Sequence, residues 1–125
     1  MKKQNVLYEK SYAFAIRIVK LSRFLKEQNE YILSKQIVRS GTAIGALISE
    51  AKFAQSHADF LHKLTVALKE ANETNYWLNL LYDTEYITEQ MHGSLYKNLD
   101  EILALLIATT KTLKARPKAT SVPNS

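Results

Sequence analysis

Apolar residues recur with a helical period along most of the chain. The first such segment runs from about Val6 to Lys26, and its expected inward face, spaced by seven, four, three and four residues, is formed by Leu7, Phe14, Ile18, Leu21 and Leu25. The second runs from about Tyr31 to Phe53, and its expected face is formed by Leu33, Ile37, Ser40, Ile44, Leu47 and Ala51. These patterns predict two amphipathic helices that share a core.

Two polar residues mark the starts of two further helices. Ser56 stands three residues before Asp59, which is the pattern of an N-cap with a first-turn carboxylate, and Thr88 is expected to cap the next helix after a connection from Asp83 to Ile87. The expected inward face of the third helix is Leu61, Leu64, Leu68, Ala71, Asn75, Leu78 and Tyr82. That of the fourth helix is Met91, Leu95, Ile102, Leu105, Thr109 and Leu113.

The middle of the second helix is built from small residues, namely Ser40, Gly41, Ala43, Gly45 and Ala46. A glycine inside a helix costs about 1 kcal/mol relative to alanine. The sequence therefore predicts that the backbone of a neighbouring helix comes close at this point.

The position of the prolines and the lengths of the helices and loops indicate the architecture that we expect. Of the 125 residues none is proline before Pro117, which disfavours a β protein with many turns. Four long helices joined by short loops predict an all-α protein, an antiparallel up-down-up-down four-helix bundle. We expect one domain over residues 1–115 and a flexible basic tail over residues 116–125.

Composition excludes several classes of protein. The chain has no cysteine, which excludes disulfide scaffolds, thiolate zinc sites and thiol nucleophiles. Its longest apolar run, Ile102 to Ala108, is far shorter than the roughly 20 residues that span a bilayer. We therefore expect a soluble, cytoplasmic protein that does not interact with membranes.

Two acid-x-x-His pairs suggest a di-metal bundle, but their positions disfavour a shared site. Asp59 and His62 open the third helix, whereas Glu89 and His92 open the fourth, so in an antiparallel pair they lie at opposite ends. Ser94-x-x-Lys97 lacks the companion motifs of a serine acyl-transfer site, and no glycine-rich phosphate loop is present. We expect no catalytic residues, cofactor, metal or small-molecule substrate, and hence no enzyme.

Charge is unevenly distributed along the chain. The net charge is +6 over residues 1–55, −5 over residues 56–101 and +4 over residues 102–125, which gives +5 in total. The candidate nucleic-acid-binding residues are the cations of the first helix, Lys10, Arg17, Lys20, Arg23 and Lys26. The same residues also fit two other interpretations, a contact with the acidic half of a neighbouring subunit and a plain solvated surface.

Two segments are apolar around the whole helix, Tyr76-Trp77-Leu78 with Leu80-Leu81-Tyr82, and Ile102 to Ala108. Because a protomer can bury only one stripe of each helix, these segments predict self-association unless loops or the tail cover them. The candidate interface residues are Tyr76, Trp77, Leu80, Leu103 and Ile107.

One cross-helix ion pair is also expected. Counted from the turn near Gln55 and Ser56, Arg39 lies level with residue 72 or so, which brings it within one turn of Glu70 and Glu73. The alternative is three independent solvated charges.

The segment from Arg39 to Ala51 (RSGTAIGALISEA), with Asp59-Phe60 and the run from Ala67 to Thr74 (ALKEANET), resembles one family. These residues are similar to bacterial four-helix-bundle proteins of the 23S ribosomal RNA intervening-sequence type, sometimes labelled ribosomal. The resemblance covers Tyr8 to Leu106. The chain departs from the family pattern at Ala43 and Leu47, where serine and asparagine are common.

The resemblance implies an antiparallel four-helix protomer, often assembled into a ring of five, and a proposed link to RNA. A remote relative, the accessory protein of diversity-generating retroelements, is a basic pentamer that binds nucleic acid and a reverse transcriptase. We therefore expect a non-enzymatic homo-oligomer, a pentamer by resemblance, that binds RNA through its basic face. The alternative is a protein–protein interaction scaffold with no role in nucleic-acid binding.

Overall fold

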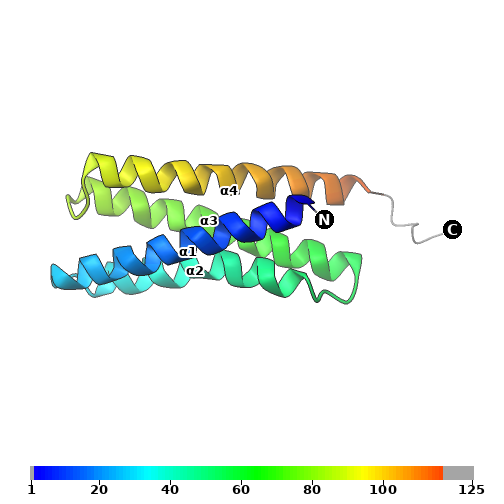
Figure 1. Cartoon of the computed structure of the whole chain (residues 1–125), viewed down its shortest axis with the longest axis horizontal. Coiled ribbons are helices and arrows are strands. Elements are labelled where there is room, and N and C mark those ends of the chain that lie inside the picture. Colours follow the sequence, from blue (N-terminus) through cyan, green and yellow to red (C-terminus); the bar gives the residue numbers. More distant parts are fainter. Residues whose placement is uncertain (1, 117–125) are drawn as a thin grey trace, which may run out of the picture.

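The protein is an antiparallel four-helix bundle. A computed structural model describes residues 2–116, with side chains from residue 5 onward. The helices are α1 (Lys2–Glu27), α2 (Ile32–Ala51), α3 (His57–Asp83) and α4 (Glu89–Ala115). Each packs against the next, and α1 closes the bundle against α4 (Figure 1). The predicted up-down topology is confirmed, whereas the expected tail lies, beyond Arg116, outside the described residues.

The ends of the helices agree with the predicted caps. Ser56 Oγ accepts a hydrogen bond from the Asp59 N–H at 3.0 Å, and Thr88 Oγ1 accepts one from the Met91 N–H at 3.1 Å. Several predicted bounds differ from those observed. Helix α1 begins at residue 2 rather than about 6, α2 ends at Ala51 rather than about Phe53, and the connection between α3 and α4 covers 84–88 rather than 83–87.

The core follows the predicted face of α1 and departs from those of α3 and α4. All five residues predicted for α1 are buried. In α3 the buried residues are Leu64, Ala67, Ala71, Thr74, Leu78 and Leu81, and in α4 they are Leu95, Leu99, Ile102, Leu106, Thr110 and Leu113. The inward assignments of Tyr82 and Thr109 were therefore wrong, since Tyr82 is exposed and Thr110 is buried in place of Thr109, whereas Leu105 is partly buried and packs against the core.

The shift in α3 brings a small polar residue into contact with α2. The predicted and the observed seams share Leu64, Ala71 and Leu78 and differ in the residues between them. The observed seam uses the small Thr74, whose hydroxyl donates to Ser40 Oγ of α2 at 2.9 Å. Asn75, predicted to occupy a core position, lies beside the seam, and its Oδ1 is buried without a hydrogen-bond partner among the described residues.

Helices α1 and α2 approach closely at the glycines of α2, as predicted. A Cβ atom on Gly41 would lie 2.8 Å from Ile18 Cγ2, and one on Gly45 would lie 3.4 Å from the carbonyl oxygen of Ser11. Ala46, in contrast, is exposed and takes no part in the contact. Near the turn the same two helices share a buried hydrogen bond of 2.6 Å between the hydroxyls of Ser22 and Ser34.

A cluster of charges joins α2 to α3 on the outside of the bundle. Arg39 lies 3.3 Å from Glu70 Oε1 and also pairs with Glu73, so the structure brings together the three residues that the sequence pairs. Trp77 Nε1 donates to the second carboxylate, Glu73 Oε2, at 3.0 Å. The indole and the guanidinium therefore share one acceptor.

Gly41→Ala should destabilise the protein, because the new methyl group meets the fully buried Ile18 side chain. Overpacking of this kind costs about 1–3 kcal/mol, which exceeds the gain in helix propensity. The control is Gly93→Ala in α4, where no atom lies within 4 Å of the new Cβ and a gain of up to about 1 kcal/mol is expected. Urea unfolding of both variants measures the difference, and equal effects would contradict the close contact.

Candidate nucleic-acid interface

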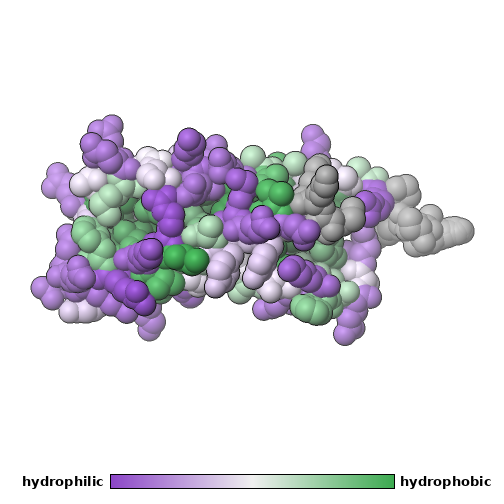
Figure 2. All heavy atoms as spheres, in the orientation of Figure 1, coloured by the Kyte–Doolittle hydropathy of each residue, from purple (hydrophilic) through white to green (hydrophobic). Residues whose placement is uncertain are grey.

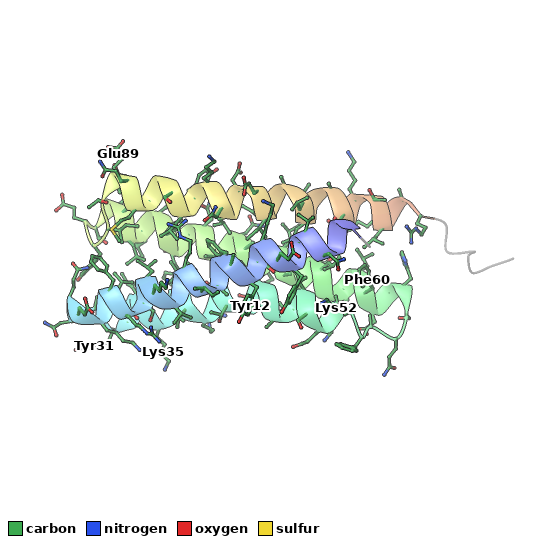
Figure 3. All side chains as sticks on the ribbon, in the orientation of Figure 1. Tyr12, Tyr31, Lys35, Lys52, Phe60 and Glu89 are labelled. Atoms are coloured by element: carbon green, nitrogen blue, oxygen red, sulfur yellow. The ribbon has the colours of Figure 1, made fainter. Side chains whose placement is uncertain are left out.

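Unpaired cations collect at the end of the bundle where α1 turns into α2. We call this set the hairpin patch and define it as Lys20, Arg23 and Lys26 of α1 with Lys35 of α2. All are exposed, and none forms an ion pair with any residue that the structure describes. Figure 3 places Lys35 beside Tyr31 at this end, far along the bundle from Lys52. The patch therefore presents positive charge from two helices.

The turn between α1 and α2 is rigid and keeps the patch together. Asn29 has a φ of 63°, and its N–H donates to the carbonyl oxygen of Lys26 at 2.9 Å. The Glu30 carboxylate accepts the N–H of Leu33 at the start of α2, where the helix dipole favours a negative charge. Glu27, beside Lys26, is also exposed, and it forms no ion pair with any described residue.

Lys35 was absent from the sequence-based set, although a simple signal points to it. Residues at similar distances from a tight helix–helix turn lie near each other in an antiparallel pair. The cations at the end of α1 therefore predict that a cation in the first turns of α2 belongs with them. The pattern of α1 alone does not reveal this neighbour.

Arg17 belongs to the fold rather than to the patch. Its guanidinium donates to Ser94 Oγ at 2.9 Å, to the Ser94 carbonyl oxygen at 3.2 Å and to Asn98 Oδ1. Arg17 is therefore set apart from Lys20 and Arg23, because its guanidinium is bonded to α4. Three of its five N–H donors are therefore already used within the protomer.

Lys10 is also engaged with α4. Its Nζ lies 3.3 Å from Glu101 Oε1, and both side chains are partly exposed. An exposed pair of this kind contributes at most about 1 kcal/mol and can exchange partners. Of the five cations chosen from sequence, three thus have no ion-pair partner in the part of the chain that the structure describes.

The candidate interface residues of α3 and α4 differ in exposure. Tyr76 is 60% exposed and Ile107 is 53% exposed, whereas Trp77, Leu80 and Leu103 are partly buried. Trp77 and Leu103 pack against the core of their own protomer. The apolar surface available to a second copy on these helices therefore centres on Tyr76 and Ile107.

The residues considered for metal binding do not converge. His92 Nε2 lies 2.8 Å from Asn79 Oδ1, and its ring stacks between those of Tyr82 and Tyr96. His62 lies at the other end of α3. Over the part of the chain that the structure describes, no three His, Asp or Glu residues are grouped so as to hold a metal ion. Nor does any helix of residues 2–115 have the length and apolarity needed to cross a membrane.

The 23S rRNA-intervening sequence protein family matches residues 3–108 of this chain. The chain belongs to this family. A crystal structure from Bacteroides thetaiotaomicron VPI-5482, a protein with unknown function from the S23 ribosomal protein family, superposes with a TM-score of 0.85 at 57% identity. The match covers 87% of this chain and 98% of that one. No curated protein matches the sequence. The fold and the family expected from the residues between Arg39 and Thr74 are therefore confirmed.

The two kinds of cation on α1 are expected to respond differently to truncation in this member of the family. Arg17→Ala should lower the free energy of unfolding by about 1–2 kcal/mol, because it removes hydrogen bonds between α1 and α4. Lys20→Ala should change it by less than about 0.5 kcal/mol, because this side chain is exposed and unpaired. Urea denaturation of both variants tests the assignment, which is wrong if Lys20→Ala costs as much as Arg17→Ala.

Proposed function

We propose that the protein is a non-enzymatic, homo-oligomeric helical bundle that binds RNA through the hairpin patch. The observation that carries the proposal is the set of four exposed cations from α1 and α2 that lack ion-pair partners among the described residues. The description of the family, which refers to an intervening sequence of 23S rRNA, supports RNA as the polyanion. The basic character of the remote retroelement relative agrees with this choice.

The patch favours the backbone of RNA over its bases. Lysine and arginine on helix surfaces contact phosphates, which position a protein without reading sequence. Two exposed rings adjoin the patch, Tyr31 one turn before Lys35 and Phe24 next to Arg23, which are too few for an array on which several bases could stack. We expect affinity that depends on charge and little on sequence.

Salt-dependent binding tests this proposal. The patch variant Lys20→Glu/Arg23→Glu/Lys26→Glu/Lys35→Glu should lose binding to a labelled RNA of arbitrary sequence, measured by fluorescence anisotropy. Each contacting cation of the parent should contribute about 0.7 to the slope of log K against log salt on a single strand. The matched control, which carries the same change in charge on exposed lysines elsewhere, reverses Lys52, Lys69, Lys97 and Lys111.

The comparison separates the patch from net charge. Loss of binding in the patch variant alone supports the proposal, and equal loss in both variants shows that only the total charge matters. If the parent does not bind RNA at low salt, the competing class of function, a protein-interaction scaffold, takes its place. The observation that favours this second class is the exposure of large apolar side chains such as Tyr76 and Ile107.

Self-association is the second part of the proposal, and the resemblance suggests a ring of five. Native mass spectrometry should show a multiple of the 14.3 kDa chain, with five copies expected. Ile107→Glu should weaken the assembly, because it puts a charge on the exposed apolar surface of α4. Ile32→Glu is the control, since Ile32 of α2 is even more exposed and lies outside the proposed interface. A monomer at micromolar concentration contradicts this part.

A further inference from the structure

A hollow at one end of the bundle combines aromatic rings with carboxylates. It has a volume of about 510 Å³, lies between the end of α1 and the connection from α3 to α4, and is lined by Phe24, Tyr82 and Tyr86 together with Asp83 and Glu85. Phe24 and Tyr82 are 38% and 37% exposed, so part of each ring remains open to solvent. On the face that shows α1, Figure 2 has apolar atoms gathered near this end between hydrophilic side chains.

The wall of the hollow is fixed by the backbone. In the connection, the N–H groups of Thr84, Glu85 and Tyr86 donate to carbonyl oxygens of α3 at 2.9–3.0 Å. Gln28 Nε2 of the first turn donates to the carbonyl oxygen of Tyr86 at 3.2 Å and so links the two loops at this end. The backbone that carries the two carboxylates and Tyr86 therefore has a defined arrangement before any ligand binds.

The chemistry of the lining selects a cation. The faces of aromatic rings attract ammonium and guanidinium groups, and the two carboxylates add opposite charge. A phosphate would be repelled by Asp83 and Glu85, and a purely apolar side chain would leave both carboxylates without a partner. A lysine or arginine side chain fits this lining best.

The chain itself carries exposed cations at the opposite end of the bundle. Lys114 and Arg116 line a second hollow of about 380 Å³ with His57 and His62 of α3. Both cations are exposed and form no ion pair with a described residue, and no acidic residue follows Glu101 in the sequence. The 27 residues of α4 separate the two hollows by roughly 40 Å, so one protomer cannot join them.

We propose that the basic end of one copy, through Lys114 and Arg116, docks into the aromatic and acidic hollow of a second copy. The contact is head to tail, because it uses two different surfaces on the two copies. It differs from the lateral contact at Ile107 and does not involve the hairpin patch. Because the hollow and the opposite end of the same chain carry complementary charges, the molecule that we assign to the hollow is a second copy of this protein.

A charge-swap experiment tests the docking. The first variant, Asp83→Lys/Glu85→Lys, makes the hollow basic, and the second, Lys114→Glu/Arg116→Glu, makes the other end acidic. The sedimentation coefficient of the parent should rise with concentration at low salt, whereas that of each variant alone should not. In an equimolar mixture of the two variants the sedimentation coefficient should again rise with concentration, because each end of one variant then meets an oppositely charged end of the other.

Two controls exclude a general effect of charge. Glu9→Lys/Asp100→Lys and Lys69→Glu/Lys97→Glu make the same changes in charge at exposed positions away from the two hollows, and each should behave like the parent. Phe24→Leu keeps the apolar volume but removes a ring face, and should weaken the association about two- to fivefold. Circular dichroism verifies that each variant is folded.

The proposal fails if the parent and both charge variants show the same concentration dependence, or if the mixture does not regain that of the parent. It also fails if the two control variants lose association to the same extent, since the effect then follows total charge. None of these outcomes depends on whether RNA binds.

Discussion

The close approach of α1 and α2 at Gly41 is the contact on which the bundle's geometry depends. Ile18 of α1 occupies the space that a side chain at Gly41 would fill, and it is fully buried there. Because two helices at this distance exclude larger side chains, the core between them is narrow. Near the turn, the buried hydrogen bond between Ser22 and Ser34 joins the same two helices. The same proximity places the lysines at the end of α1 beside the first turns of α2.

Polar side chains stabilise the contact between α1 and α4, two helices that no loop joins directly. Consecutive helices are joined by connections of four or five residues, whereas α1 and α4 are separated by the rest of the chain. This seam carries the hydrogen bonds of Arg17 to Ser94 and Asn98 and the pair of Lys10 with Glu101. Two cations predicted from sequence to bind a ligand therefore help to close the bundle instead. The cations without ion-pair partners among the described residues lie farther along α1.

The sequence predicts the buried side of this protein better than its surface. Periodicity identified the inward face of α1, and capping chemistry identified Ser56 and Thr88. Spacings of three and four residues define two adjacent seams on α3, however, and only the contact of Thr74 with α2 decides between them. The partners of Arg17 were unpredictable for a related reason. They lie 77 and 81 residues away, and a polar side chain on a helix surface carries no periodic signal of its own.

Charge at the ends of the bundle comes from side chains rather than from the helices. In an antiparallel bundle each end holds two helix N-termini and two C-termini, so the helix dipoles largely cancel. The end that contains the α1–α2 and α3–α4 connections nevertheless carries opposite charges on its two sides. Lys26 and Lys35 lie at the first connection, and Asp83 and Glu85 lie at the second. A polyanion and a cationic side chain can therefore bind at the same end without competing, because each is repelled from the other's position. This arrangement makes simultaneous RNA binding and head-to-tail contact electrostatically compatible.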